Sequence, residues 1–173
     1  MKYIVIINGI GRSGKDTFVE ICQEILKPFH IPVYNLSSID PVKDAAEHLD
    51  LPRNPEHKTD AVREFWYDIK MAWVKYNDGP FNYLRSNIGK HPEGVFFLHI
   101  REVEEVEKVV KAFPGAIKLE VSRKNVDQLF NRADTQVRKI KYDLEIKNDG
   151  TLEELKKKAE DFLFKDLGVR VIA

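Results

Sequence analysis

The 173-residue chain contains a single cysteine, Cys22. One cysteine cannot form an internal disulfide, so the sequence excludes a disulfide-stabilised secreted domain and fits a reducing compartment. Apolar residues around Cys22 recur at helical spacing, and a cysteine in that pattern is typically a buried thiol rather than a nucleophile. We therefore expect Cys22 to belong to the core.

The chain also lacks long apolar runs and an excess of charge of either sign. No stretch approaches the roughly 20 apolar residues that a membrane span needs, and the first apolar run is too short for a signal peptide. Lysine and arginine total 28, as do aspartate and glutamate, so no net charge favours nucleic acid or an anionic membrane. We expect a cytoplasmic protein, monomeric or homodimeric, with neither of these partners.

Glycine is sparse, yet three of the nine glycines lie between positions 9 and 14. The apolar run before them predicts a strand buried on both faces, and a helix is expected from Lys15. Residues 9–15 fit G-x-x-x-x-G-K in this strand–loop–helix context, which predicts a nucleoside triphosphate site built from loop N–H groups, a helix N-terminus and Lys15. The predicted nucleotide ligands here are Gly9, Gly11, Arg12, Ser13, Gly14, Lys15, Asp16 and Thr17.

The residue after the lysine is Asp16 instead of the usual serine or threonine, and a hydroxyl follows at Thr17. A carboxylate is a hard oxygen ligand that can hold Mg²⁺ directly or through water. The alternative is an acidic residue that the helix dipole favours in the first turn. Asp16 and Thr17 are the candidate metal ligands, and Thr17 is also a candidate donor to the α-phosphate.

Strands and helices alternate along the rest of the chain, which predicts one α/β domain over residues 1–173 with a central parallel sheet of about five strands. Strands are expected over 3–7, 31–36, 94–100, 116–121 and 142–147, with a possible terminal strand over 169–173. Helices are expected over 15–29, 41–49, 58–77, 79–90, 102–113 and 151–167. Two successive helices in about 51–92 exceed a plain crossover and indicate a substrate-binding insertion.

Ligands of open α/β sheets bind beyond the carboxyl ends of the strands. Asp40 and Lys43 follow the second strand and are candidate site residues; the alternative is a helix cap and a solvated lysine. Arg101 follows the buried third strand, where an anionic substrate group would satisfy its guanidinium; the alternative is an ion pair with a nearby glutamate. At the end of the same strand, His99 is expected to be a satisfied core histidine rather than a base.

Further arginines are candidate phosphate ligands. Arg63 and Arg85 lie in the predicted insertion, although an exposed helical arginine is more often solvated. The basic segment of about 122–142 has few apolar residues and predicts a mobile lid whose Arg132 and Arg138 reach the transferring phosphoryl group. The alternative is a solvated basic surface helix.

Four segments carry a resemblance to a known family. They are GIGRSGKDT at 9–17, DPVK at 40–43, IRE at 100–102 and NDGTLEEL at 148–155. In this order they resemble the phage-type deoxynucleoside monophosphate kinases, within the wider P-loop kinase group that includes dephospho-CoA kinases.

The resemblance implies a three-layer α/β/α fold that transfers the γ-phosphoryl group of ATP, with Mg²⁺, to a nucleoside monophosphate. It places adenine near Asn148 and Asp149, and Lys43 and Arg101 toward the acceptor. The family has an aspartate at the position of His99, and its lid arginines repeat more regularly than those found here.

Two other functions remain open. A small-molecule kinase with a hydroxyl acceptor would need a base, for which Asp40 is the candidate. The lack of an aspartate at position 99 would fit a non-catalytic nucleotide-binding regulator. The guanine-reading motif N-K-x-D, however, is absent from the sequence. The inserted helices and the basic segment favour an enzyme with a second substrate.

Overall fold

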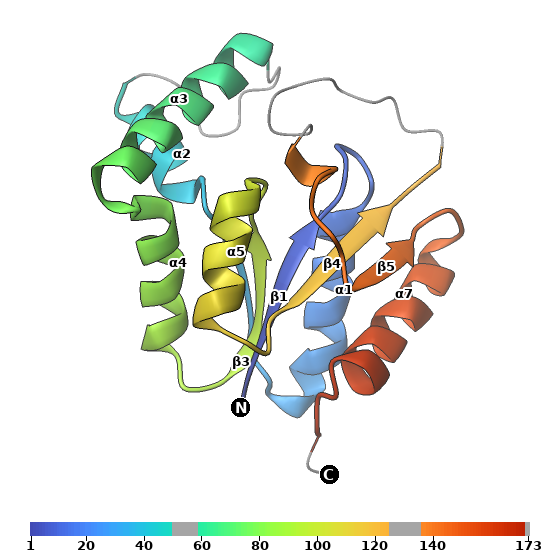
Figure 1. The fold of residues 1–173 in the computed structure, drawn as a ribbon. Coiled ribbons are helices and arrows are strands. Elements are labelled where there is room, and N and C mark those ends of the chain that lie inside the picture. The colour runs from blue at the N-terminus through green and yellow to red at the C-terminus, as the bar shows by residue number, and fades with distance from the viewer. Residues whose placement is uncertain (50–58, 125–135, 172–173) are drawn as a thin grey trace. The chain divides into compact units, whose positions relative to one another are not determined.

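The structure is a computed structural model that describes residues 1–49, 59–124 and 136–171 (Figure 1). The chain forms two compact units: Met1–Asn35 together with His91–Ala173, and Leu36–Lys90. The second unit contains the helices predicted as an insertion, but it begins earlier than expected, directly after the middle of the second strand. Within the described ranges, no helix is both long and apolar enough to cross a membrane.

A five-stranded parallel sheet forms the centre of the fold, in the order β2-β3-β1-β4-β5. The strands are β1 (Lys2–Asn8), β2 (Val33–Ser37), β3 (Gly94–His99), β4 (Ile117–Ser122) and β5 (Leu144–Lys147). The last five residues of β1 are buried, and so are the first five of β3. Continuous burial explains their apolar sequences, because a central parallel strand has both faces covered. The predicted α/β class and sheet are confirmed.

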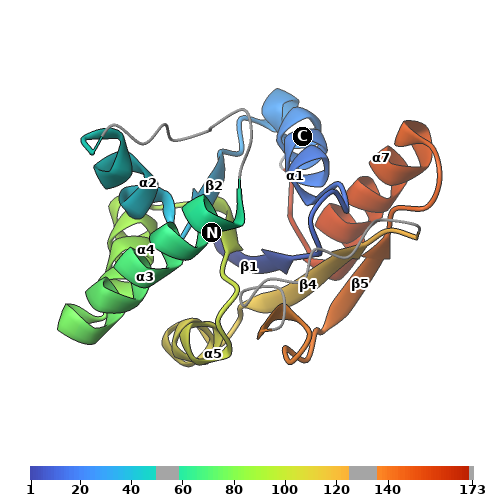
Figure 2. The same cartoon turned by 90° about the horizontal axis from the view of Figure 1, so that it is seen from above.

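Helices cover both faces of the sheet in the first unit (Figure 2). The helices α1 (Lys15–Leu26) and α7 (Leu152–Asp161) lie on one face, and α5 (Val103–Ala112) lies on the other. The ring of Phe18 on α1 packs edge-on at 6.5 Å from Phe97 of β3 and 5.6 Å from Phe162 after α7. Cys22 lies in the same core, and burial raises the pKa of its thiol.

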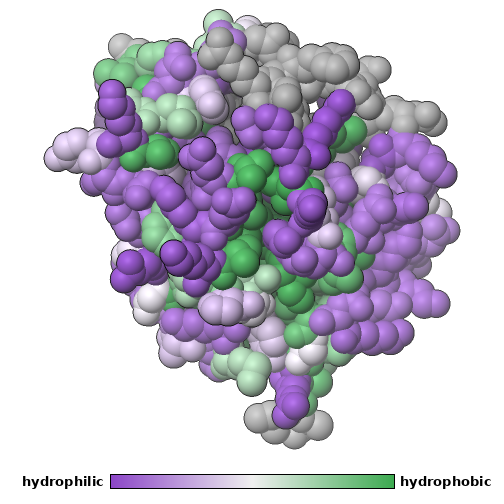
Figure 3. All heavy atoms as spheres, in the orientation of Figure 1, coloured by the Kyte–Doolittle hydropathy of each residue, from purple (hydrophilic) through white to green (hydrophobic). Residues whose placement is uncertain are grey.

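The ends of several elements follow from local chemistry. Thr151 caps α7 by accepting a hydrogen bond from the Glu154 N–H at 3.2 Å, as the capping-box pattern predicts. The outward surface of α7 is hydrophilic (Figure 3). The first helix ends three residues earlier than predicted, in a separate 3₁₀ turn over Lys27–Phe29. Residues 169–171 form no strand, so the terminal strand is absent from this part of the chain.

The second unit consists of α2 (Asp40–Glu47), α3 (Asp60–Asn77) and α4 (Gly79–Lys90). Its small core contains Val42 and Ala46 of α2 against Trp66 of α3. The Thr59 hydroxyl caps α3 by accepting a hydrogen bond from the Val62 N–H at 3.4 Å. The two long helices expected from the apolar stripes are therefore present, with boundaries within two residues of the predicted ones.

Candidate functional site

The glycine-rich segment connects β1 to α1, as the sequence predicts. The loop turns tightly, with the Ser13 N–H donating to the Ile10 carbonyl at 3.1 Å. Arg12 and Gly14 have positive φ angles of 66° and 88°. The second of these two positions is held by glycine, which adopts this conformation without steric cost.

Two glycines of the motif are required by close neighbours. A Cβ at position 9 would lie 2.3 Å from the Val121 carbonyl of β4 and 2.4 Å from the Ser13 Oγ. A Cβ at position 14 would lie 2.2 Å from the Asn148 Nδ2. A side chain at position 9 would thus meet a main-chain carbonyl, and one at position 14 would displace the Asn148 amide.

The start of α1 presents unpaired backbone donors. The first hydrogen bond of the helix runs from the Phe18 N–H to the Gly14 carbonyl at 2.9 Å. The N–H groups of residues 14–17 thus have no acceptor within the helix, and Gly14 has no side chain to cap them. Four such donors at the positive end of a helix dipole are suited to binding an anion.

Lys15 and Asp16 begin the helix side by side. The Lys15 Nζ lies 3.5 Å from the Asp16 Oδ2, and the Lys15 side chain is 17% exposed against 70% for Asp16. Asp16 and the exposed Thr17 offer oxygen donors of the kind that Mg²⁺ prefers. Within the described residues, no group of three or more His, Cys, Asp or Glu side chains forms a metal site by itself. The donor set fits a Mg²⁺ ion that takes its other ligands from nucleotide phosphates and water.

Ser13 is an unusual polar residue inside the loop. It is 1% exposed, and its Oγ has no hydrogen-bond partner among the described residues. Buried hydroxyls are normally paired, and an unpaired one costs free energy. The Ser13 hydroxyl is therefore an unsatisfied donor within the loop.

Asn148 holds the loop from the far end of the chain. Its Nδ2 donates to the Ser13 carbonyl at 2.9 Å, and its backbone N–H donates to the Ser122 carbonyl at 2.7 Å. The side chain is buried, so its amide fixes the loop backbone and is already engaged. The expectation that Asn148 lies near adenine remains a prediction, whereas its contact with the loop is observed.

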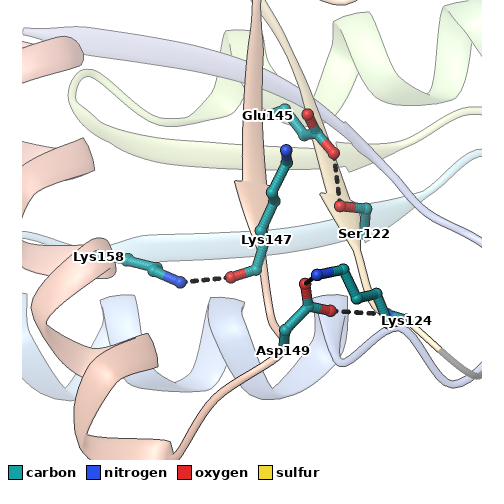
Figure 4. Close-up of polar contacts among 6 residues, drawn as sticks. All are labelled: Ser122, Lys124, Glu145, Lys147, Asp149 and Lys158. Carbon is teal, nitrogen blue, oxygen red and sulfur yellow. Dashed lines mark hydrogen bonds and ion pairs between the residues drawn. The ribbon is translucent and has the colours of Figure 1, made fainter.

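Asp149 joins the ends of β4 and β5 (Figure 4). Its Oδ1 accepts a hydrogen bond from the Lys124 N–H at 2.7 Å, and its Oδ2 lies 3.6 Å from the Lys124 Nζ. The bond from the Lys124 N–H is the main cause that lowers the pKa of Asp149. Ser122 donates to Glu145 at 2.6 Å, and the Lys158 Nζ donates to the Lys147 carbonyl at 2.5 Å. These contacts order the backbone next to Asn148.

The carboxyl end of β3 carries His99, and Arg101 follows. The His99 Nε2 lies 2.6 Å from the Asn35 Oδ1 of β2, so this histidine is hydrogen-bonded as expected, but it is only half-buried and does not belong to the core. Ile100 is fully buried, and its carbonyl accepts a hydrogen bond from the Asn8 Nδ2 at 2.7 Å. Arg101 is half-buried beyond this point. Its role toward a substrate stays a prediction.

In the second unit, the structure brings Asp40 and Lys43 together. The Asp40 Oδ1 lies 3.7 Å from the Lys43 Nζ, and its Oδ2 accepts a hydrogen bond from the Ser37 N–H at 2.8 Å. Asp40 is the first residue of α2 rather than its cap. The Lys43 ammonium lies 5.9 Å from the centre of the Trp66 ring, a cation–π distance.

Sequence reasoning missed Lys70 in this unit. Its ammonium donates to the Ser38 Oγ at 2.7 Å, and the residue is only 2% exposed. Its position four residues after Trp66 was the available signal, because that spacing places both side chains on the buried stripe of α3. A lysine on an apolar stripe is unusual and marks a buried polar contact.

Four further arginines are predicted phosphate ligands. Arg63 is half-buried at the start of α3, Arg85 is exposed on α4, and Arg138 is exposed. Arg132 lies outside the described residues. The prediction that these four arginines bind phosphate groups is therefore open.

Comparison with known proteins agrees with this architecture. No family model and no curated protein matches the chain. Among solved structures, shikimate kinase from Aquifex aeolicus superposes with a TM-score of 0.56 at 16% identity, covering 98% of this chain and 100% of that one. A gluconokinase from Sinorhizobium meliloti superposes with a TM-score of 0.51 at 12% identity, covering 95% and 93%.

The chain has the fold of the P-loop kinases. Both superpositions span more than nine-tenths of each chain, so the likeness extends over the sheet and the helices that flank it. At these identities the likeness concerns the fold, and the chemistry must be argued from the side chains.

Proposed function

We propose that this chain is an ATP-dependent phosphotransferase whose acceptor is a nucleoside or deoxynucleoside monophosphate. The observation that carries the proposal is the row of backbone N–H groups at residues 14–17, with Lys15 beside them and Ser13 unpaired within the loop. This arrangement is chemically suited to a polyphosphate chain. The fold shared with two kinases supports the same class.

Phosphoryl transfer depends on in-line positioning and on neutralisation of charge around a loose transition state. The loop N–H groups hold the β- and γ-phosphates, and the Lys15 ammonium neutralises charge on the transferring group. Mg²⁺, held by Asp16 and Thr17 together with the phosphates, would supply further charge neutralisation when bound. Arg101 would bind the acceptor phosphate through its fork of donors.

None of the residues assigned above to nucleotide, metal or acceptor binding is given the role of a general base, and a monophosphate acceptor does not require one. A monophosphate has its second pKa near ~6, so it is largely ionised at neutral pH and needs no strong base. His99 is already hydrogen-bonded to Asn35. The segments at 40–43, 100–102 and 148–155 that resemble the monophosphate kinases support the same acceptor.

A hydroxyl acceptor is the second candidate. The two structural neighbours are named for shikimate and gluconate, which are hydroxy acids rather than nucleotides. In that case Asp40 would act as the base, although its carboxylate already accepts the Ser37 N–H and lies near the Lys43 ammonium. These contacts favour the monophosphate acceptor.

A coupled ADP-release assay across nucleoside monophosphates, dephospho-CoA and small hydroxy acids tests the proposal. We expect turnover with a monophosphate and a loss of at least about 100-fold in kcat/KM for Lys15→Ala, by analogy with the removal of one transition-state donor. Lys27→Ala, an exposed lysine beyond the other end of α1, is the matched control. Turnover with a hydroxyl acceptor alone would favour the second candidate. Tight ATP binding without any turnover would indicate a regulator.

A further inference from the structure

A chain of hydrogen bonds begins at Asn8, the residue before the first glycine of the loop. Its Nδ2 donates to the Ile100 carbonyl at 2.7 Å, and its side chain also hydrogen-bonds the Tyr142 hydroxyl. The Tyr142 hydroxyl in turn donates to the Val137 carbonyl at 3.0 Å. A primary amide has two N–H donors, and this geometry uses both.

The environment of Tyr142 supports this direction of donation. Burial, followed by the charge of Glu120, raises the pKa of the phenol, whereas the bond with Asn8 lowers it. A hydrogen bond lowers an acid's pKa when it is donated to the oxygen that becomes charged. The phenol has one O–H, which donates to the Val137 carbonyl at 3.0 Å, so its oxygen is the acceptor in the contact with Asn8.

The three partners of Asn8 belong to segments far apart in the chain. The β1–β3 register runs from Lys2↔Gly94 to Ile6↔Leu98, and the Asn8 side chain extends this connection to Ile100. On its other side, Asn8 pairs in register with Glu120 of β4. The amide thus joins the start of the phosphate loop to the end of β3 and to Tyr142.

We propose that Asn8 is a positioning residue of the phosphoryl-transfer site, holding the phosphate loop, the end of β3 before Arg101, and Tyr142 in one fixed arrangement. This inference rests on the proposed function. Asn8 is only 3% exposed, Ile100 is fully buried, and Val137 is nearly so, so these contacts lie inside the protein, where packing restricts movement. Transfer rates are sensitive to displacements of about 1 Å, which can cost about 100-fold.

The loop is also held by hydrogen bonds from other residues, so a loss of positioning can be told apart from a loss of nucleotide binding. The Ser13 N–H bonds the Ile10 carbonyl, and the Ser13 carbonyl accepts from Asn148. These contacts do not involve Asn8. Removal of the Asn8 amide is therefore expected to leave the loop able to bind ATP while releasing its alignment with Ile100 and Tyr142.

The test compares Asn8→Ala and Tyr142→Phe with Val109→Ala, a core truncation in α5 that serves as the control for lost stability. ATP affinity is measured by calorimetry, and kcat and the KM for the acceptor come from the coupled assay. For Asn8→Ala we expect an ATP Kd within about threefold of the wild type and a kcat lower by about 10- to 100-fold. Tyr142→Phe keeps the hydrogen bond from Asn8 to Ile100, so we expect a smaller loss of kcat.

Hydrogen–deuterium exchange gives a readout that does not depend on turnover. In the wild type, ATP is expected to protect residues 100–101 and 137–142, and Asn8→Ala should lose this protection while keeping protection of the loop. The inference is overturned if kcat falls no further than in Val109→Ala, or if the ATP Kd rises in parallel with the loss of kcat. If the wild type phosphorylates no acceptor, the proposed function is wrong, and the positioning role of Asn8 is then tested by hydrogen–deuterium exchange alone. Protection at 100–101 that persists in Asn8→Ala would then overturn the positioning role.

Discussion

Replacement of Gly14 by alanine should destabilise the protein through two separable effects. The residue has a φ of 88°, and an L-residue in the left-handed region costs about 1–2 kcal/mol. The new Cβ would also lie 2.2 Å from the Asn148 Nδ2 and displace the amide from the Ser13 carbonyl. A buried hydrogen bond broken with a group left unpaired costs about 1–3 kcal/mol. The combined loss is therefore about 2–5 kcal/mol.

Other glycines in the same chain isolate the two effects. Gly168 has a φ of +68°, and a Cβ at this position would have nothing within 4 Å, so Gly168→Ala should cost only the backbone strain of about 1–2 kcal/mol. Gly115 has open space and no positive φ, so Gly115→Ala should lie within about 0.5 kcal/mol of the wild type. Asn148→Ala should cost the hydrogen bond alone, about 1–3 kcal/mol.

The double variant Gly14→Ala/Asn148→Ala decides between coupled and independent effects. Because the bond to Ser13 can be lost only once, the double variant should be about as stable as Gly14→Ala by itself. Urea unfolding followed by circular dichroism measures each free energy of unfolding. If the losses of the two single variants add up to the loss of the double variant within about 0.5 kcal/mol, position 14 and Asn148 are not energetically coupled.

Three further predictions concern titrating groups. Cys22 should react with a thiol reagent only as fast as the protein unfolds, because burial raises the pKa of its thiol; rapid labelling of the native protein at about pH 8 would contradict this. Burial, and then the charge of Glu145, raise the pKa of Glu120. The free energy of unfolding therefore falls as the pH rises from the pKa of Glu120 in the unfolded chain through its higher pKa in the folded protein. Glu120→Gln should therefore be more stable than the wild type at about pH 7, with the gain disappearing near about pH 4; an equal gain at both values would count against it. The pKa of Asp149 is lowered, mainly by the Lys124 N–H, so Asp149→Asn should lose stability at neutral pH, and this deficit should close as the pH falls below the ordinary range of aspartate; a deficit independent of pH would argue for another cause.

The position and turn of the glycine-rich loop were predictable because their determinants are local. Gly9, Gly14 and Lys15 lie within seven consecutive residues, and their conformations follow from the turn that joins β1 to α1. The central strands were predictable for a related reason, since burial on both faces imposes an unbroken apolar sequence. The confirmed burial of Cys22 follows from helical periodicity in the same way.

The polar contacts around the loop were not predictable in this way. Asn8 and Ile100 are separated by 92 residues, and Asn148 and Ser13 by 135. No spacing rule relates such positions, and the sequence around an asparagine does not indicate which distant carbonyl its side chain will contact. The lysine–serine contact in the second unit was missed for the same reason, because it links residues 32 positions apart.

The contact between Asn148 and Ser13 has a consequence for synthesis. A ribosome must add 135 residues after Ser13 before the amide that braces its carbonyl exists. Stalled or truncated chains therefore carry a complete glycine motif on an unbraced loop, and we expect them to retain ATP far more weakly than the finished protein. The glycine loop is therefore braced only after a segment 135 positions later in the chain has been made.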